Sequence, residues 1–168
     1  MTKHCTTCGL PTNQEKENLW VCDSGHNNWA NPTAGSIVYV IKDNKVIYGV
    51  RSVEPNSGKL SLPGGFIEIG ESAENTATRE VKEELGIDVE IIHYLGSYPS
   101  EYTSGKPSIN LVFVAKYIAG EINYSDDMNG GEPVWYSVDS LPDQNELAWS
   151  WYEKAQRDFT NWLKSHSV

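Results

Sequence analysis

The apolar positions of the chain alternate or run together in short stretches, a pattern typical of β-strands. "SIVYVI" and "KVIYGV" are rich in β-branched and aromatic residues, and "KDN" between them has turn chemistry, which predicts a hairpin. "LSLPGGFIEI" is interrupted by Pro63, Gly64 and Gly65, so it predicts one strand and then a short second one. The predicted strands cover residues 36–41, 45–50, 60–69, 89–98, 108–119 and 132–138.

Two other stretches have apolar residues at helical spacing. Ser72 is a good N-cap for a helix over residues 73–85, and Gly86 follows as its C′ residue. From Glu146 to Lys164, "ELAWSWYEKAQRDFTNWLK" contains no helix-breaking residue, which predicts a closing helix. The order strands, helix, strands, helix predicts an α+β fold with a mixed sheet.

The cysteines indicate a boundary in the chain. Cys5, Cys8 and Cys22 are the three cysteines, and all lie in the first 22 residues. "NPT" at 31–33 supplies a hinge, because Pro32 cannot continue a helix. We therefore predict a small module over residues 1–32 and a main domain over residues 33–168.

The small module has the spacing of a zinc site. Cys5-x-x-Cys8 and Cys22-x-x-x-His26 are two short pairs separated by thirteen residues, and thiolate and imidazole ligands suit tetrahedral Zn²⁺. His26 is the expected fourth ligand, with His4 in reserve. A disulfide is the alternative, but three cysteines in a cytoplasmic chain favour zinc.

Charge and hydropathy restrict the partners. The formal net charge is −10, and such a surface repels a phosphate backbone, so we expect no nucleic-acid partner. A phosphate-containing substrate would require bound cations. No apolar run approaches the roughly 20 residues that span a bilayer, and "MTKHCTTCGL" has no apolar h-region, so we expect a cytoplasmic protein with no membrane partner.

The predicted helix over 73–85 carries acidic residues that local helix physics disfavours. Glu80, Glu83 and Glu84 fall within about one quadrant, because successive residues turn by about 100°. They repel one another near the C-terminal end, where the helix dipole also disfavours negative charge. They form either a solvated face with Arg79 and Lys82, or a site for Mg²⁺ or Mn²⁺, which prefer carboxylate oxygens.

A wider pattern favours the metal site. Gly65, five residues, Glu71, seven residues, and then "REVKEELGI" from Arg79 to Ile87 match every fixed position of the Nudix box. The chain therefore resembles the Nudix hydrolases in its order of elements from about Ala34 to Leu141. The resemblance implies an α/β/α sandwich that hydrolyses the pyrophosphate bond of a nucleoside diphosphate linked to another moiety, with Mg²⁺ or Mn²⁺.

The resemblance also implies residue roles. Glu80, Glu83 and Glu84 would bind the divalent cations, the backbone carbonyl of Gly65 would join them, and Arg79 would orient a box glutamate. We expect Glu84 or Glu83 to be the general base. The later loop "NYSDDMNGGEPVW" offers the alternatives Asp126, Asp127 and Glu132.

The cysteine module resembles the zinc ribbon of some Nudix enzymes, including NADH pyrophosphatases and a group acting on FAD or ADP-ribose. Those ribbons usually close with Cys-x-x-Cys, which would place a cysteine at Gly25. NADH pyrophosphatases also carry Ser-Gln-Pro-Trp-Pro-Phe-Pro after the box, and "SYPSEYTSG" at 97–105 lacks its tryptophan and phenylalanine. The resemblance to these ribbon-bearing enzymes gives ADP-ribose, FAD and an NADH-like dinucleotide as the candidate substrates.

Four residues are candidate substrate contacts. Arg51 could contact phosphate, and Tyr98 and Tyr102 could stack on a base or a flavin; Glu132 lies in a loop that could fold over the site. The alternative functions are a noncatalytic nucleotide sensor, which the intact box argues against, and an RNA-cap hydrolase, which the acidic charge argues against. Many Nudix proteins dimerise, so a homodimer is also expected.

Overall fold

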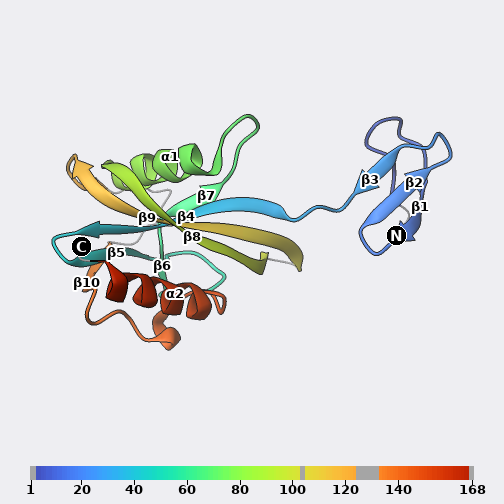
Figure 1. The fold of residues 1–168 in the computed structure, drawn as a ribbon. Helices are drawn as coiled ribbons and strands as arrows, with labels where there is room; N and C mark the ends of the chain where they lie inside the picture. Colours follow the sequence, from blue (N-terminus) through green and yellow to red (C-terminus); the bar gives the residue numbers. More distant parts are fainter. Residues whose placement is uncertain (1–2, 103–104, 124–132, 167–168) are drawn as a thin grey trace. The chain divides into compact units, whose positions relative to one another are not determined.

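The computed structural model describes residues 3–102, 105–123 and 133–166. The chain divides into two compact units, Met1–Pro32 and Thr33–Val168 (Figure 1). In the described part of the chain, every helix is too short or too polar to cross a bilayer.

The first unit is a three-stranded antiparallel sheet. Its strands are β1 (Thr12–Lys16), β2 (Leu19–Cys22) and β3 (Asn27–Trp29), in that order across the sheet. Its buried apolar residues are Cys5, Leu19 and Cys22. A core this small does not stabilise a separate unit, so a cross-link or a metal has to contribute.

The second unit is built on a mixed sheet in the order β10-β5-β4-β9-β8. The central strands β4 and β9 are parallel, and the neighbouring pairs along the rest of this order are antiparallel. Two short strands extend it: β6 pairs with β5, and β7 pairs with the first half of β4. The strands are β4 (Thr33–Lys42), β5 (Lys45–Val50), β6 (Leu60–Ser61), β7 (Gly64–Phe66), β8 (Asp88–Tyr102), β9 (Lys106–Ala119) and β10 (Val134–Ser137).

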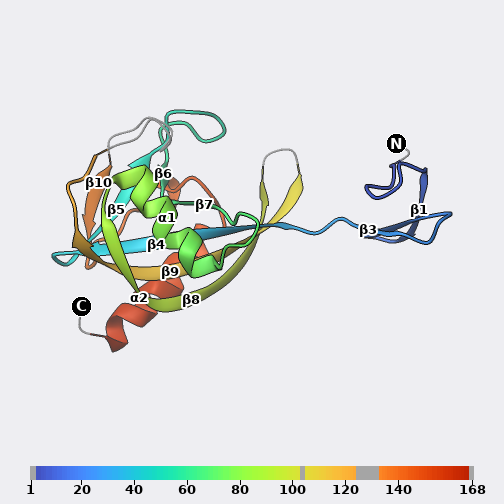
Figure 2. The same cartoon turned by 90° about the horizontal axis from the view of Figure 1, so that it is seen from above.

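One helix covers each face of this sheet. Helix α1 (Ala73–Leu85) lies on one face and α2 (Tyr152–Ser165) on the other (Figures 1 and 2). The pleat of β4 explains the two cores, since Val38 and Val40 pack with α1 whereas Tyr39 and Ile41 pack with α2. The predicted α/β/α sandwich with a mixed sheet is therefore confirmed.

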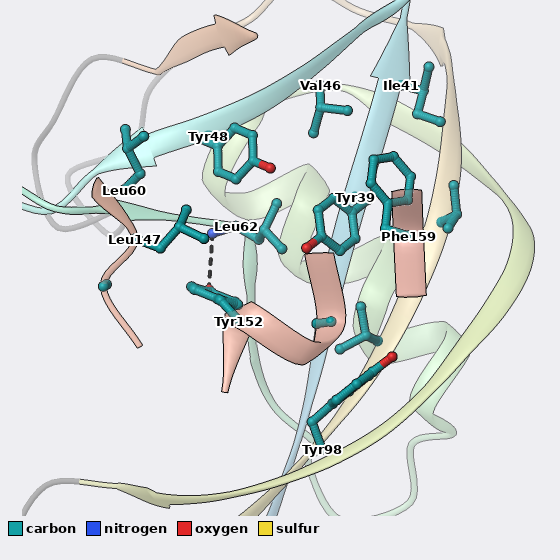
Figure 3. Packing of buried hydrophobic residues seen from close by; sticks show 14 of the residues in the cluster. Tyr39, Ile41, Val46, Tyr48, Leu60, Leu62, Tyr98, Leu147, Tyr152 and Phe159 are labelled. Atoms are coloured by element: carbon teal, nitrogen blue, oxygen red, sulfur yellow. Dashed lines mark hydrogen bonds between the residues drawn. The ribbon is translucent and has the colours of Figure 1, made fainter. Parts of the chain in front are cut away.

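The core beneath α2 is aromatic (Figure 3). The rings of Tyr39 and Phe159 stack with centroids 4.1 Å apart. The hydroxyl of Tyr152 accepts a hydrogen bond of 3.1 Å from the backbone amide of Leu62, in the segment between β6 and β7. The start of α2 is thus tied to the strand segment that leads into β7.

The closing helix is shorter than its sequence pattern predicted. A 3₁₀ turn occupies Gln144–Glu146, and Leu147 has extended backbone angles. The amide of Ala148 donates to the carbonyl of Leu60 at 2.8 Å, so this segment bonds to β6. A long-range backbone contact therefore displaces the expected helix start at Glu146, and α2 begins only at Tyr152.

Candidate active site and metal sites

Helix α1 is fixed at both ends and along one side. Ser72 caps it by accepting a hydrogen bond of 3.1 Å from the amide of Asn75, and Gly86 ends it in the left-handed conformation, with φ at 73°. Its buried residues face the sheet and fix the rotation of the helix, so the acidic side faces the loop that contains β7. These residues are Thr76, Ala77, Val81 and Leu85.

Arg79 links three carboxylates. Its Nε and Nη2 bond the two oxygens of Glu71 at 2.7 and 2.9 Å. Its Nη1 bonds Oε1 of Glu80 at 2.8 Å and Oε2 of Glu83 at 2.9 Å. Glu80 and Glu83 therefore share one donor atom, which holds their carboxylates close together despite their repulsion.

The network also sets the charge state of these groups. Hydrogen bonds from Arg79 and then from the Thr76 hydroxyl lower the pKa of Glu71 to about 2. The bond to Glu71 in turn raises the pKa of Arg79. Burial raises the pKa of Glu80, although Arg79 opposes that effect. Near neutral pH, Glu71 and Arg79 therefore form a charged pair, and the same guanidinium holds Glu80 and Glu83.

Two glycines bring the β7 loop against α1. The amide of Gly64 donates to Oε2 of Glu84 at 2.9 Å. Gly64 has φ at 148°, and a β-carbon there would collide with the backbone of Ser36, while one on Gly65 would collide with the carboxylate of Glu80. At Gly64 only a glycine fits against the backbone, and at Gly65 the missing side chain leaves room for the Glu80 carboxylate, so the loop lies next to the helix carboxylates.

The sequence-predicted catalytic residues therefore gather in one place. Arg79, Glu80, Glu83, Glu84 and the Gly65 backbone belong to one contact network of β7 and α1. Carboxylate and carbonyl oxygens are the ligands that Mg²⁺ and Mn²⁺ prefer, so this donor set fits a hard divalent cation.

A cavity of about 170 Å³ adjoins this network. It is bordered by Gly65 and Glu84 of the box and by Gly64, which precedes the box. Arg51 also lines it, with its guanidinium carbon 5.1 Å from the centre of the Trp149 ring and its Nε bonded to the carbonyl of Pro55. The other lining residues include Gly35, Ile37, Leu62, Phe66, Ser100, Glu101, Ser108, Asn110, Trp149, Trp151 and Tyr152.

Sequence reasoning missed several of these wall residues. Trp149 and Trp151 lie in the stretch predicted as helix, where aromatic residues indicate core packing. Ser108 and Asn110 lie at the polar start of a mostly apolar stretch that is predicted as a strand. Polar residues at inward positions of a buried strand were the available signal.

The candidate substrate contacts have different positions. Tyr98 lies in the core, only 2% exposed, and its hydroxyl donates to Asp158 at 2.9 Å. Its ring lies 6.0 Å from that of Trp151, so it supports the cavity wall from behind. The side chain of Tyr102, together with Asp126, Asp127 and Glu132, falls outside the described residues.

The first unit contains the predicted cysteine–histidine cluster. The Sγ atoms of Cys8 and Cys22 are 3.7 Å apart, and Nδ1 of His26 lies 3.6 Å from Cys22 and 3.7 Å from Cys5. The donor atoms of all four residues lie within 4.8 Å of one another. Ligands about 2.3 Å from a tetrahedral ion are separated by about 3.8 Å, so the spacing fits Zn²⁺.

The disulfide alternative does not hold, because all three cysteines are free. Burial opposes ionisation of the Cys5 thiol, but hydrogen bonds from Asn28 and from the amides of Cys8 and Thr7 outweigh it and lower its pKa to about 5. A stabilised thiolate is the form that binds a metal ion. Gly25 has φ at 80°, which favours glycine where related ribbons have cysteine.

Comparison with known proteins identifies the fold and the family. The family model described as "NUDIX domain" matches residues 29–159. The chain belongs to the Nudix hydrolase family. Members of this family use divalent metal ions, which agrees with the donor set of the box.

Similarity to individual proteins supports the same family. An ADP-ribose pyrophosphatase from Methanocaldococcus jannaschii is 35% identical over 122 residues, covering 72% of this chain and 69% of the relative. The NAD-capped RNA hydrolase NudC from Salmonella typhi is 33% identical over 141 residues, covering 83% of this chain. The matched part spans about half the length of that NudC, 53%. A crystal structure of a NUDIX hydrolase from Nitrosomonas europaea has the same fold, with a TM-score of 0.72, 22% identity, and coverage of 98% and 92% of the two chains.

Proposed function

We propose that this chain hydrolyses the pyrophosphate bond of a nucleoside diphosphate linked to a further moiety. The observation that carries the proposal is the Arg79 network, which holds Glu80 and Glu83 together beside Gly65 and Glu84. A solvated acidic face needs neither the bidentate ion pair between Arg79 and Glu71 nor a glycine at position 64 that lets the β7 loop approach α1.

Glu80, Glu83 and Glu84, with the carbonyl of Gly65, would hold Mg²⁺ or Mn²⁺. Such an ion neutralises the diphosphate and lowers the pKa of a bound water. Glu84 lines the cavity, so we propose that its carboxylate accepts the proton of the attacking water, with Glu83 as the alternative base. Arg79 acts as a positioning residue, because it contacts the carboxylates that bind the ion.

The relatives narrow the substrate to dinucleotide-like diphosphates. One is named an ADP-ribose pyrophosphatase and the other an NAD-capped RNA hydrolase. ADP-ribose, FAD and NADH-like dinucleotides are therefore the proposed substrates. The cysteine–histidine cluster lies in the other unit, and we propose that it binds a structural Zn²⁺, since four protein ligands leave no open position.

A substrate screen tests this function. The protein is incubated with ADP-ribose, FAD, NADH, dinucleoside polyphosphates, coenzyme A and nucleoside triphosphates, and released monophosphate is measured with Mg²⁺, with Mn²⁺ and without either. We expect metal-dependent release of AMP from ADP-ribose, FAD or NADH. No turnover of any compound with either metal would reject the proposal and favour a nucleotide sensor.

A further inference from the structure

The cavity beside the box has one wall that joins the proposed metal site directly. A β-carbon placed on Gly35 would lie 3.1 Å from the carbonyl oxygen of Gly65 and 3.9 Å from Oδ1 of Asn110. A ligand group next to a diphosphate held at Gly65 therefore reaches this wall. The inference rests on the proposed function, because the box has to hold the diphosphate.

This wall, formed by Ser100, Ser108 and Asn110, is polar and largely buried. Ser108 is 6% exposed and Asn110 is 9% exposed, and both come from the same face of β9. Ser100 of β8 pairs directly with Ser108. We call these three residues the polar wall.

The internal hydrogen bonds of the polar wall leave groups directed to a ligand. The amide nitrogen of Asn110 donates to the carbonyl of Tyr98 at 3.2 Å and to the hydroxyl of Ser100 at 2.9 Å. Those bonds use both of its N–H groups, so Oδ1 is left as an acceptor and the Ser100 hydroxyl as a donor. Within the described chain, the Ser108 hydroxyl makes no hydrogen bond. Neither Ser108 Oγ nor Asn110 Oδ1 is among the fully buried side-chain atoms that lack a partner. Both are therefore accessible from the cavity and can pair with the hydroxyl groups of a ligand.

The lining of the cavity also contains apolar and aromatic residues. Among them are Trp149, Trp151, Ile37 and Leu62. The volume of about 170 Å³ is below the roughly 300–1,000 Å³ of complete ligand pockets, so the cavity accommodates one ring of a ligand and not a whole dinucleotide. A sugar ring has the matching chemistry, since its C–H face packs on aromatic surface while its hydroxyls bond polar groups.

We propose that the cavity binds a ribose ring attached directly to the diphosphate, with its hydroxyls on the polar wall and a C–H face towards Trp149 and Trp151. The ring can be the nucleoside ribose or the ribose on the other side of the diphosphate. Both sources share the same chemistry, and analogues that lack one hydroxyl distinguish them.

The test compares kcat/KM for ADP-ribose with that for 2′-deoxy-ADP-ribose, modified in the nucleoside ring, and for 2″-deoxy-ADP-ribose, modified in the other ring. The wild-type enzyme should lose roughly tenfold on one analogue, because a buried hydrogen bond is removed. Ser108→Ala should lose about as much on ADP-ribose and should no longer discriminate against that analogue. Ser97→Ala, on the exposed side of β8, is the matched control and should behave as wild type.

The outcomes separate this inference from the proposed function. A penalty confined to the 2′ analogue assigns the cavity to the nucleoside ribose, and one confined to the 2″ analogue assigns it to the second ribose; either supports the inference. The inference is overturned if the wild type hydrolyses ADP-ribose and both analogues at the same rate and if Ser108→Ala behaves as Ser97→Ala does. The proposed function would still stand in that case. Failure of the wild type on all substrates refutes the function itself.

Discussion

The two groups of potential metal ligands in this chain are built in opposite ways. In the first unit, three thiols and an imidazole converge within 4.8 Å of one another. In the second, the box glutamates are held by Arg79 and by the Gly64 amide instead. Among the described residues, only the cysteine–histidine group places three or more such donor atoms this close.

The difference follows from what each site has to do. Gly9 and Gly25 have positive φ in the turns beside the first group. A metal ion held by its four residues would have a closed tetrahedral site and would add to the small hydrophobic core of this unit. The box is a set of oriented carboxylates on a helix, open towards a cavity. A site that admits a metal together with a diphosphate requires that openness.

The largest effect should come from breaking the first group. Cys22 contacts both Cys8 and His26, so Cys22→Ser should abolish zinc binding and unfold the small unit, because structural zinc contributes about 10–16 kcal/mol. Metal analysis and hydrogen exchange over residues 3–30 measure this. His4→Ala is the control, since His4 is not part of the cluster. Full zinc content and unchanged exchange protection in Cys22→Ser would contradict the closed site.

Glu84→Gln should have the next largest effect. The amide keeps the shape of the side chain but cannot accept a proton as the carboxylate does, so kcat should fall by about 10²–10⁴. Zinc content and thermal stability should stay near the wild-type values. Glu90→Gln, on the exposed surface of β8, is the control. Near wild-type turnover in Glu84→Gln would mean that Glu84 is not the general base and would favour Glu83.

Substitutions at two neighbouring glycines should separate an effect on metal binding from an effect on folding. In Gly65→Ala the new methyl group displaces only the end of the Glu80 side chain, so about tenfold more Mg²⁺ should be needed for half-maximal activity, with little change in Tm. In Gly64→Ala the methyl group meets the backbone of Ser36 and Ile37, so Tm should fall. Mg²⁺ titrations and thermal melts measure both. Identical behaviour of the two variants would contradict this division.

The smallest effect concerns the Glu71–Arg79 pair. The pKa of Glu71 is lowered from 4.5 to about 2 in the folded chain, so the pair stabilises the fold above about pH 4.5. That stabilisation is lost as the pH falls from about 4.5 towards 2. The difference in free energy of unfolding between wild type and Glu71→Gln should therefore shrink over that interval, as urea titrations at pH 6, 4.5 and 3 would show. A constant difference would contradict the pairing.

Local signals allowed much of the fold to be predicted. The cap residues Ser72 and Gly86 delimit α1 as expected. The hairpin turn at Asp43 and Asn44 has positive φ at both residues, as its composition indicated. The box residues come together because they lie on one short helix and the loop before it, so their sequence spacing already defines their spatial relation.

The cavity could not be predicted, because its walls come from distant segments. The amide of Ala148 bonds to Leu60, which interrupts the expected closing helix and brings Trp149 and Trp151 to the cavity. The polar wall depends on the register Ser100↔Ser108 between two strands. No local sequence pattern indicates either pairing. The apolar residues at helical spacing over 146–164 even predicted a helix where the bond between Ala148 and Leu60 lies.

The bond between the Tyr152 hydroxyl and the Leu62 amide has a consequence for how such enzymes are recognised in genomes. A shortened relative that ends before residue 147 would keep every position of the diagnostic motif and lose this anchor along with both tryptophans. Motif searches would still count that protein as a hydrolase, although one side of its ligand chamber would be missing. In this chain, a complete cavity therefore depends on the segment just ahead of the final helix as well as on the motif.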